Sequence, residues 1–131
     1  MIFLDANIPM YLVGAEHPNK SSARRLVEAS VSRQDRLVTD VEVLQEILHR
    51  YAALRRPDAI QPAFDVLLGL VDDVFSIDTD DVQSAKQVLL AGSDLSARDT
   101  LHIAVMRRHG VDTIMSFDRG FDRSPGLTRL G

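Results

Sequence analysis

Four carboxylic acids stand at places in this sequence where they could hold a metal ion: Asp5, Glu46, Asp99 and Asp118. Asp5 directly follows the apolar run Ile2–Leu4. Asp118 follows a second strand-like run, Thr113–Ser116, after one intervening residue. Carboxylates gathered at one site repel each other by on the order of 4 kcal/mol per pair, for unit charges ~4 Å apart at an effective dielectric of ~20. Bound cations would make such a cluster favourable, and oxygen ligands suit the hard ions Mg²⁺ and Mn²⁺.

The elements that must position these acids follow from apolar periodicity, which switches between short strand-like runs and longer helical ones. The predicted strands are Ile2–Leu4, Leu37–Thr39, Val74–Ile77 and Thr113–Ser116, with Thr128–Leu130 as a candidate fifth. The predicted helices are Asn7–Val13, Ser21–Ser32, Asp40–Leu54, Gln61–Val71, Asp81–Leu90 and Ser96–His109. Strands that alternate with helices indicate parallel βαβ units, so we expect one α/β domain over residues 1–131.

Open parallel sheets bind ligands at the edge where their strands end. Asp5 and Asp118 both follow strands, so both are expected at this edge. Glu46 lies about two turns into the helix that follows the strand Leu37–Thr39, which keeps it within reach of the same edge. Asp99 precedes its strand, and topology alone does not place it.

Each acid also has a structural role open to it. The alternatives are a helix cap for Asp5, a helix-start pair of Ser96 with Asp99, an ion pair of Glu46 with Arg50, and a turn opened by Asp118. Thr39 with Glu42 similarly resembles a capping box. For each acid considered alone, the structural role is the favoured interpretation. The presence of all four acids together favours a metal site.

Composition limits the classes of protein to be considered. The chain has 131 residues, 45% of them apolar, and no apolar stretch approaches the ~20 residues that span a bilayer. The absence of cysteine excludes disulfides and thiolate ligands and fits a reducing cytoplasm, the expected location. The apolar start lacks the basic region of a signal peptide. The formal net charge is −4, and all but two of the 15 basic residues are arginine, whose planar fork can bond two phosphate oxygens.

Four segments occur in the order and at the intervals of a known family: MIFLDAN, VLQEIL, LSARDTLHIAVMRRHG and IMSFDRGFD. Together they resemble the PIN-domain ribonucleases, and most closely the VapC-type toxins of bacterial toxin–antitoxin pairs. The resemblance covers nearly the whole chain. It implies a PIN-like three-layer α/β/α fold around a mostly parallel sheet of four to five short strands.

The resemblance also assigns the site. The catalytic acids that it implies are Asp5, Glu46, Asp99 and Asp118, with the polar residues Asn7 and Ser116 beside them. Glu42, one turn before Glu46, competes for the second position. The placement of Asp99, which topology left open, comes from the resemblance alone.

The implied chemistry is cleavage of RNA with Mg²⁺ or Mn²⁺. Cations held by Asp5, Asp99 and Asp118 would neutralise the scissile phosphate and lower the pKa of the attacking water, and Glu46 would complete the cage. Arginines at the rim would hold the RNA: Arg98, Arg119 and Arg123. The chain has five Phe, two Tyr and no Trp, which favours recognition by shape and backbone over stacking on bases.

The resemblance further implies protein partners, namely a second copy in a homodimer and a cognate antitoxin whose tail lies in a groove. Such a tail places a basic residue against the acids. Apolar positions of the helices Ser21–Ser32 and Asp40–Leu54 could supply these surfaces, or they could belong to the core. No membrane partner is expected.

Three other classes of protein compete with this interpretation. A magnesium-dependent phosphohydrolase of another α/β class would have Asp-x-Asp after the first strand, but Asn7 stands at the second position. A phospho-receiver domain would need paired early acids and a late lysine, and neither Lys20 nor Lys86 is near a late strand. A non-catalytic PIN-like module that binds RNA or protein remains open, although the presence of all four acids argues against it.

Overall fold

Five short strands form the central sheet of the computed structural model, which describes all 131 residues. They are β1 (Ile2–Leu4), β2 (Leu37–Asp40), β3 (Asp73–Phe75), β4 (Thr113–Met115) and β5 (Thr128–Leu130). All neighbouring strands are parallel, in the order β3-β2-β1-β4-β5. The predicted parallel sheet is confirmed, including its fifth strand.

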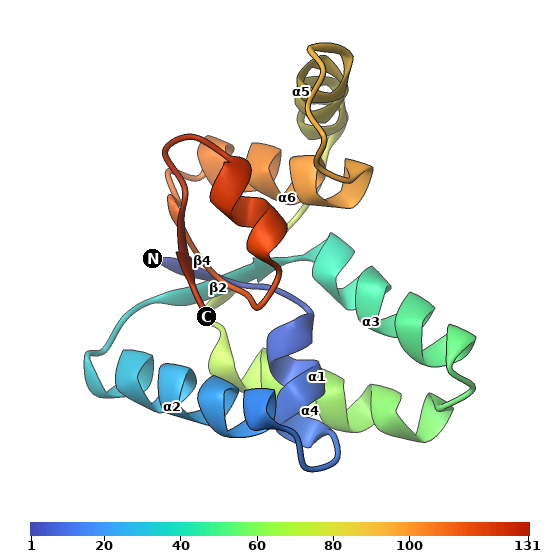
Figure 1. Cartoon of the computed structure of the whole chain (residues 1–131), viewed down its shortest axis with the longest axis vertical. Helices are drawn as coiled ribbons and strands as arrows, with labels where there is room; N and C mark the ends of the chain where they lie inside the picture. Colours follow the sequence, from blue (N-terminus) through green and yellow to red (C-terminus); the bar gives the residue numbers. More distant parts are fainter.

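Helices cover both faces of this sheet. They are α1 (Asn7–Val13), α2 (Pro18–Ser32), α3 (Val41–Ala53), α4 (Ile60–Leu70), α5 (Thr79–Leu90) and α6 (Ala97–Arg108), with the short 3-10 helices η1 (Pro57–Ala59) and η2 (Arg119–Arg123). Figure 1 shows α1, α2 and α4 on one side of the sheet and α5 and α6 on the other, which is the expected three-layer arrangement. None of the helices is both long enough and apolar enough to cross a membrane.

The strand β1 lies in the middle of the sheet, and its end defines the edge at which the acids gather. Phe3 and Leu4 are fully buried because strands flank β1 on both sides. Leu4 is in register with Met115 of β4, so Asp5 and Ser116 follow at equivalent positions. The Asp5 N–H donates to the Met115 carbonyl at 3.1 Å and extends the ladder by one bond.

The junction between β2 and α3 differs from the sequence prediction. The capping box expected for Thr39 and Glu42 does not form, because β2 continues to Asp40. Asp40 is the N-cap, and its Oδ1 accepts a hydrogen bond from the Val43 N–H at 2.9 Å. The Thr39 hydroxyl instead donates to the Leu4 carbonyl at 2.9 Å and ties β2 to β1.

Two helices begin earlier than their apolar periodicity indicated. The helix α2 starts at Pro18, where the side chain of His17 provides the cap. The helix α5 starts at Thr79, because Asp78 and Asp81 form a reciprocal capping box. Polar capping residues lie outside the apolar stripe, so periodicity does not find them.

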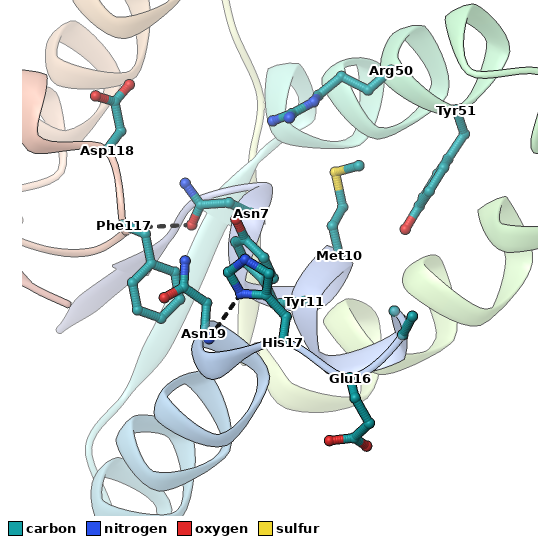
Figure 2. A pocket seen from close by; sticks show the side chains of 12 residues that line it. Asn7, Met10, Tyr11, Glu16, His17, Asn19, Arg50, Tyr51, Phe117 and Asp118 are labelled. Carbon is teal, nitrogen blue, oxygen red and sulfur yellow. Dashed lines mark hydrogen bonds between the residues drawn. The ribbon is translucent and has the colours of Figure 1, made fainter.

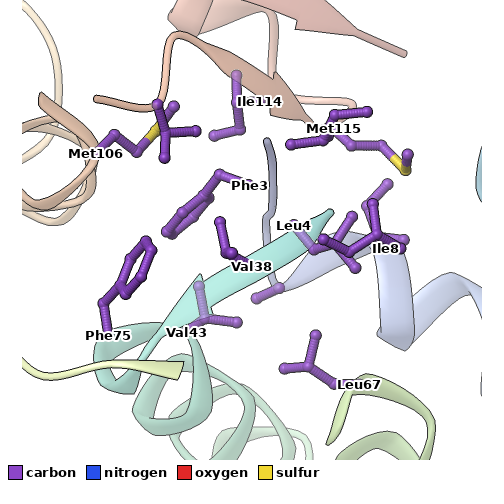
Figure 3. Close-up of a cluster of buried hydrophobic side chains, with 14 of the residues drawn as sticks. Phe3, Leu4, Ile8, Val38, Val43, Leu67, Phe75, Met106, Ile114 and Met115 are labelled. Carbon is purple, nitrogen blue, oxygen red and sulfur yellow. The ribbon is translucent and has the colours of Figure 1, made fainter. Parts of the chain in front are cut away.

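The hydrophobic core surrounds β1 and its neighbours (Figure 3). Its largest fully buried side chains include Phe3, Leu4, Ile8, Leu67, Met106, Ile114 and Met115. The apolar stripe of α3 faces this core through Val43, Ile47 and Tyr51, and α2 contributes Val27. These four positions are therefore core, whereas Val31 of α2 and Val41, Leu48 and Leu54 at α3 and its end are exposed and stay open to a partner.

Candidate active site

Asp5 is held in place by three donors at the carboxyl end of β1. Its side chain is buried, with 5% exposed. Oδ1 accepts from the Ala6 N–H at 2.8 Å. Oδ2 accepts from the Ser116 hydroxyl at 2.6 Å and from the Asn7 amide at 3.4 Å. These bonds give the carboxylate a defined orientation at the sheet edge.

Ser116 and Asn7 connect the ends of β1 and β4. Ser116 is fully buried, and its Oγ accepts from Asn7 Nδ2 at 3.1 Å and from the Asp118 N–H at 3.0 Å. Asn7 Oδ1 in turn accepts from the Phe117 N–H at 3.3 Å (Figure 2). The single hydroxyl proton of Ser116 goes to Asp5. The two polar residues therefore position both Asp5 and the backbone that carries Asp118.

Glu46 approaches Asp5 from α3, together with His102 from α6. One oxygen of each acid and one ring nitrogen of His102 lie within 4.8 Å of one another. Glu46 is 8% exposed, and burial raises the pKa of its carboxyl, followed by the charge of Asp5. Arg98 at 3.3 Å and Arg50 at 3.8 Å lower this pKa without cancelling the rise. The ion pair with Arg50 considered above therefore exists, but Glu46 also belongs to the acidic site.

His102 and Asp40 form a buried pair that sequence reasoning missed. Nδ1 of His102 lies 2.8 Å from Oδ2 of Asp40, and neither side chain is exposed. Burial opposes the charged imidazolium, but the hydrogen bond to Asp40 and the charges of Asp40, Asp5 and Glu46 outweigh it and raise the pKa of His102 to about 9. Two signals were available: Asp40 ends the run LVTD as Asp5 ends IFLD, and His102 stands three residues after Asp99 on the same helix face.

Asp99 and Asp118 add carboxylates from the start of α6 and from the turn after β4. Asp99 is half-buried, and burial raises its pKa, followed by the charges of Asp118 and Asp5. Its N–H donates to Ser96 Oγ at 3.1 Å. Asp118 is exposed, and its Oδ1 accepts from the Gly120 N–H at 2.8 Å. Helix-start and turn-forming roles therefore coexist with the acidic cluster, although neither residue joins the 4.8 Å group around His102.

Arg98 bridges the two glutamates that compete for the second acid position. Its guanidinium lies 3.4 Å from Glu42 and 3.3 Å from Glu46. Glu46 is the one that reaches Asp5, whereas Glu42 lies one turn earlier on α3. Arg98 therefore partly neutralises the site, a role that the sequence pattern did not indicate.

The other two arginines proposed for RNA differ from each other. Arg123 forms an ion pair with Asp94. Arg119 is exposed, and no ion-pair partner is found for it in the structure. The assignment of these arginines to RNA stays a prediction.

The donor atoms at this edge fit a divalent cation. Asp5 and Glu46 supply carboxylate oxygens, His102 supplies an imidazole nitrogen, and two more acids stand close by. The raised pKa values of Glu46 and Asp99 reflect burial and repulsion that a bound cation would offset. The sequence indicated ligands of oxygen alone, whereas the structure also brings an imidazole nitrogen close to the carboxylates.

A pocket of about 560 Å³ opens beside the acids and is lined by Asn7 and Asp118 (Figure 2). Tyr11 and Phe117 meet edge to face in its wall, with ring centroids 5.5 Å apart. Tyr51 of α3 lines the same pocket. Aromatic side chains are few in the composition, yet three of them gather next to the site.

The chain is similar to known sequences over nearly its whole length. The PIN domain family matches residues 2–127 of the chain. The chain is 59% identical to ribonuclease VapC13 of Mycobacterium tuberculosis over 130 residues, which is 99% of each protein. It is 38% identical to ribonuclease VapC23 of the same organism over 118 residues, covering 90% of this chain and 93% of that relative.

Solved structures share the fold. VapC20 of Mycobacterium tuberculosis, a Sarcin-Ricin loop cleaving toxin, matches with a TM-score of 0.78 at 24% identity and covers 93% of both chains. VapBC2 from Rickettsia felis, bound to a DNA fragment from its promoter, matches with a TM-score of 0.74 at 16% identity, over 99% of this chain and 98% of that one. The chain belongs to the PIN-domain family and, within it, to the VapC-type ribonucleases of toxin–antitoxin pairs.

Proposed function

We propose that this protein is a divalent-metal-dependent endoribonuclease that arrests growth by cutting RNA, and that it is the toxin of a toxin–antitoxin pair. The observation that carries the proposal is the crowding of acids at the end of β1. Glu46 and Asp99 each have a raised pKa, caused first by burial and then by another acid nearby. Such repulsion costs stability and serves no structural purpose, whereas a bound cation would offset it.

The ions would be Mg²⁺ or Mn²⁺, which supply positive charge to the scissile phosphate and lower the pKa of the attacking water. Asp5, oriented by Ser116, would hold an ion with one or both of its oxygens. Asp99 and Asp118 would bind from one helix start and one turn, and Glu46 would complete the site from α3. The bonds of Ser116 to Asp5 and to the Asp118 N–H hold the ends of β1 and β4 together before any ion binds.

We propose that the pocket in Figure 2 receives the RNA segment next to the scissile phosphate. Asn7 and Asp118 belong to both the pocket and the acidic site, so the pocket leads directly to the acids. Tyr11 and Phe117 present aromatic rings on which an unpaired base could stack, worth about 1–3 kcal/mol per base in other proteins. Stacking of a base on these rings would add to the contacts with RNA shape and backbone that the sequence favours.

Arg119 is the strongest of the three arginines as a phosphate ligand, because it is exposed and adjoins Asp118. Arg98 and Arg123 are already ion-paired, with Glu46 and Asp94 among their partners. Phosphate would have to compete with those carboxylates.

An apolar groove of about 550 Å³ beside α5 and α6 is our candidate surface for the antitoxin. Its lining includes Val82, Leu90 and Leu101, and Leu90 is 75% exposed. Arg98 also lines the groove and contacts Glu46, so a basic residue of a bound tail would reach the acids by displacing Arg98. A homodimer would cover other exposed apolar side chains of α3 and its end: Val41, Leu48 and Leu54. We expect the protein to act in the cytoplasm, where its RNA substrate would be.

Expression without the antitoxin tests the proposed function. Growth should stop on induction of the natural chain and continue on induction of Asp5→Asn. Asp65→Asn is the matched control, because Asp65 is exposed on α4. Cleavage-site mapping on total RNA from the arrested cells would identify the target. A soluble and folded Asp5→Asn protein that still arrests growth with intact RNA would support the non-catalytic alternative.

A further inference from the structure

We infer that His102 binds the metal of this site through its Nε2 atom, and that the site therefore favours a transition-metal ion such as Mn²⁺ over Mg²⁺. The inference rests on the proposed metal-dependent function. It adds a nitrogen ligand to the carboxylates and gives a role to a residue that the acidic site alone does not use.

The geometry around Nε2 is the first argument. His102 is completely buried, and its Nε2 has no hydrogen-bond partner. Buried polar atoms are almost always paired, so an unpaired one calls for a partner that is absent from the protein itself. Nδ1 is bonded to Asp40, which leaves Nε2 as the free nitrogen of a ring that stands with Asp5 and Glu46.

The spacing of the three ligand atoms is the second argument. One carboxylate oxygen of Asp5, one of Glu46 and one ring nitrogen of His102 lie within 4.8 Å of one another. Two ligands that are each about 2.1 Å from the same ion are at most about 4.2 Å apart. Small side-chain rotations of Asp5, Glu46 and His102 would therefore close the site around an ion.

The bond to Asp40 is the third argument. Histidines that bind metals commonly donate their other ring N–H to a carboxylate, which places the lone pair on the metal-facing nitrogen. Asp40 is itself held by the Val43 N–H at 2.9 Å and is fully buried. The Phe3 ring lies 5.4 Å from the His102 ring, so the imidazole is oriented by packing as well.

His109 is another histidine, and its surroundings do not fit a metal ligand. Its Nε2 is also unpaired, but its ring stacks flat on Phe75 with centroids 3.7 Å apart. The structure contains one group of three or more closely spaced acids and histidines, and that group includes His102 and not His109.

The preference for Mn²⁺ follows from ligand chemistry. Imidazole suits first-row transition metals, whereas Mg²⁺ requires oxygen ligands and retains much of its water. Binding through Nε2 uses the neutral ring with its proton on Nδ1, the nitrogen that faces Asp40.

Pulsed electron paramagnetic resonance of the Mn²⁺-loaded protein tests the inference directly. The natural chain would be stripped of metal, loaded with one equivalent of Mn²⁺, and prepared with ordinary or ¹⁵N-labelled histidine. The electron spin echo should show modulation from a coordinated ¹⁴N nucleus, and the label should replace it with the ¹⁵N pattern. The measurement needs no RNA and no activity.

Calorimetric titration with each ion gives an independent readout. We expect His102→Gln to weaken Mn²⁺ binding by at least the roughly 10- to 100-fold that loss of a supporting partner causes. Mg²⁺ binding should weaken less, so the ratio of the two affinities falls. Asp40→Asn should weaken Mn²⁺ binding within that same range. His49→Gln is the matched control, because His49 is exposed on α3, and both affinities should stay unchanged.

The possible failures are distinguishable. Bound Mn²⁺ without any histidine nitrogen coupling would overturn the role of His102 and leave the acidic metal site standing. Absence of binding by both Mn²⁺ and Mg²⁺ would overturn the metal-dependent function and the role of His102 together. If His102→Gln does not fold, the labelled natural chain still decides the question.

Discussion

The Ser116 hydroxyl donates a hydrogen bond of 2.6 Å to Oδ2 of Asp5, across 111 residues of sequence. The bond joins the ends of β1 and β4, which are neighbours in the sheet. Ser116 also accepts from the Asp118 N–H, so one hydroxyl sets the relative position of two acids. The site therefore depends on a polar residue as well as on its carboxylates.

Removal of this hydroxyl should weaken both the fold and the activity. Ser116→Ala leaves a buried Asp5 carboxylate without its shortest bond, which costs about 1–3 kcal/mol of unfolding free energy. RNA cleavage should fall, but less than in Asp5→Asn. Denaturant unfolding and cleavage rates measure the two effects. Ser84→Ala, at an exposed position of α5, serves as the control, and equal behaviour of the two variants would show that Ser116 positions nothing.

Substitutions of the two glutamates of α3 should reduce RNA cleavage to different extents. Glu46→Gln keeps the size of the side chain but removes a charge that lies within the group formed with Asp5 and His102. Glu42→Gln removes a charge from the ion pair with Arg98 alone. We expect the larger loss of cleavage from Glu46→Gln. A larger loss from Glu42→Gln would reverse the assignment of the second acid.

Asp99→Asn should stabilise the metal-free protein at neutral pH. Burial and then the charges of Asp118 and Asp5 raise the pKa of Asp99 in the folded state, so the folded chain holds this proton to higher pH than the unfolded chain does. The stability due to Asp99 is fully present below its unfolded pKa and is lost as pH rises through the folded pKa. The neutral amide avoids that loss, with a gain on the order of 1 kcal/mol.

Bound metal should make the natural chain more stable than Asp99→Asn, which reverses the order expected for the metal-free proteins. Saturating Mn²⁺ stabilises the natural chain because it binds only the folded state, and the variant has lost a ligand. Melting curves in EDTA and then in Mn²⁺ compare the natural chain, Asp99→Asn and Asp118→Asn. The gain in EDTA should be smaller for Asp118→Asn, because Asp118 is exposed and accepts a bond from Gly120. Equal destabilisation of both variants in both buffers would mean that these acids are only caps and turn formers.

His102 should make the unfolding free energy of the metal-free protein depend on pH in a second, higher range. Its folded pKa of about 9 lies above the unfolded value, so the folded state binds the proton more tightly. The resulting stability is fully present below about pH 6.5 and is lost as pH rises toward 9. Unfolding free energies measured in EDTA should therefore decline over this range. His102→Gln should flatten the decline and His49→Gln should not, and a natural chain with no decline would show that folding does not raise the pKa of His102.

The sheet and two of the acids could be predicted because their signals are local. A short apolar run that ends in an acid, as at Asp5, contains both the strand and the position of the carboxylate at its end. The alternation of strands and helices then brings Asp118 to the same edge. Two helix starts were less accurate, because the caps His17 and Asp78 lie outside the apolar stripe.

The remaining features depend on contacts that no local pattern encodes. Asp40 and His102 are 62 residues apart, and their pairing depends on how α6 packs against the end of β2. The ion pair between Arg98 and Glu46 likewise joins α6 to α3. The sequence therefore indicated acids with rim arginines, whereas the structure has one arginine and one histidine within the acidic group.

The central claim is that divalent metal bound at Asp5 and its neighbouring acids drives RNA cleavage. The most direct measurement is cleavage of a structured RNA by the pure protein in Mn²⁺, in Mg²⁺ and in excess EDTA, with Asp5→Asn measured in parallel. We predict cleavage with either ion, none in EDTA, recovery when Mn²⁺ is added back, and none by Asp5→Asn in any buffer. Cleavage by the natural chain that continues unchanged in EDTA would contradict the account.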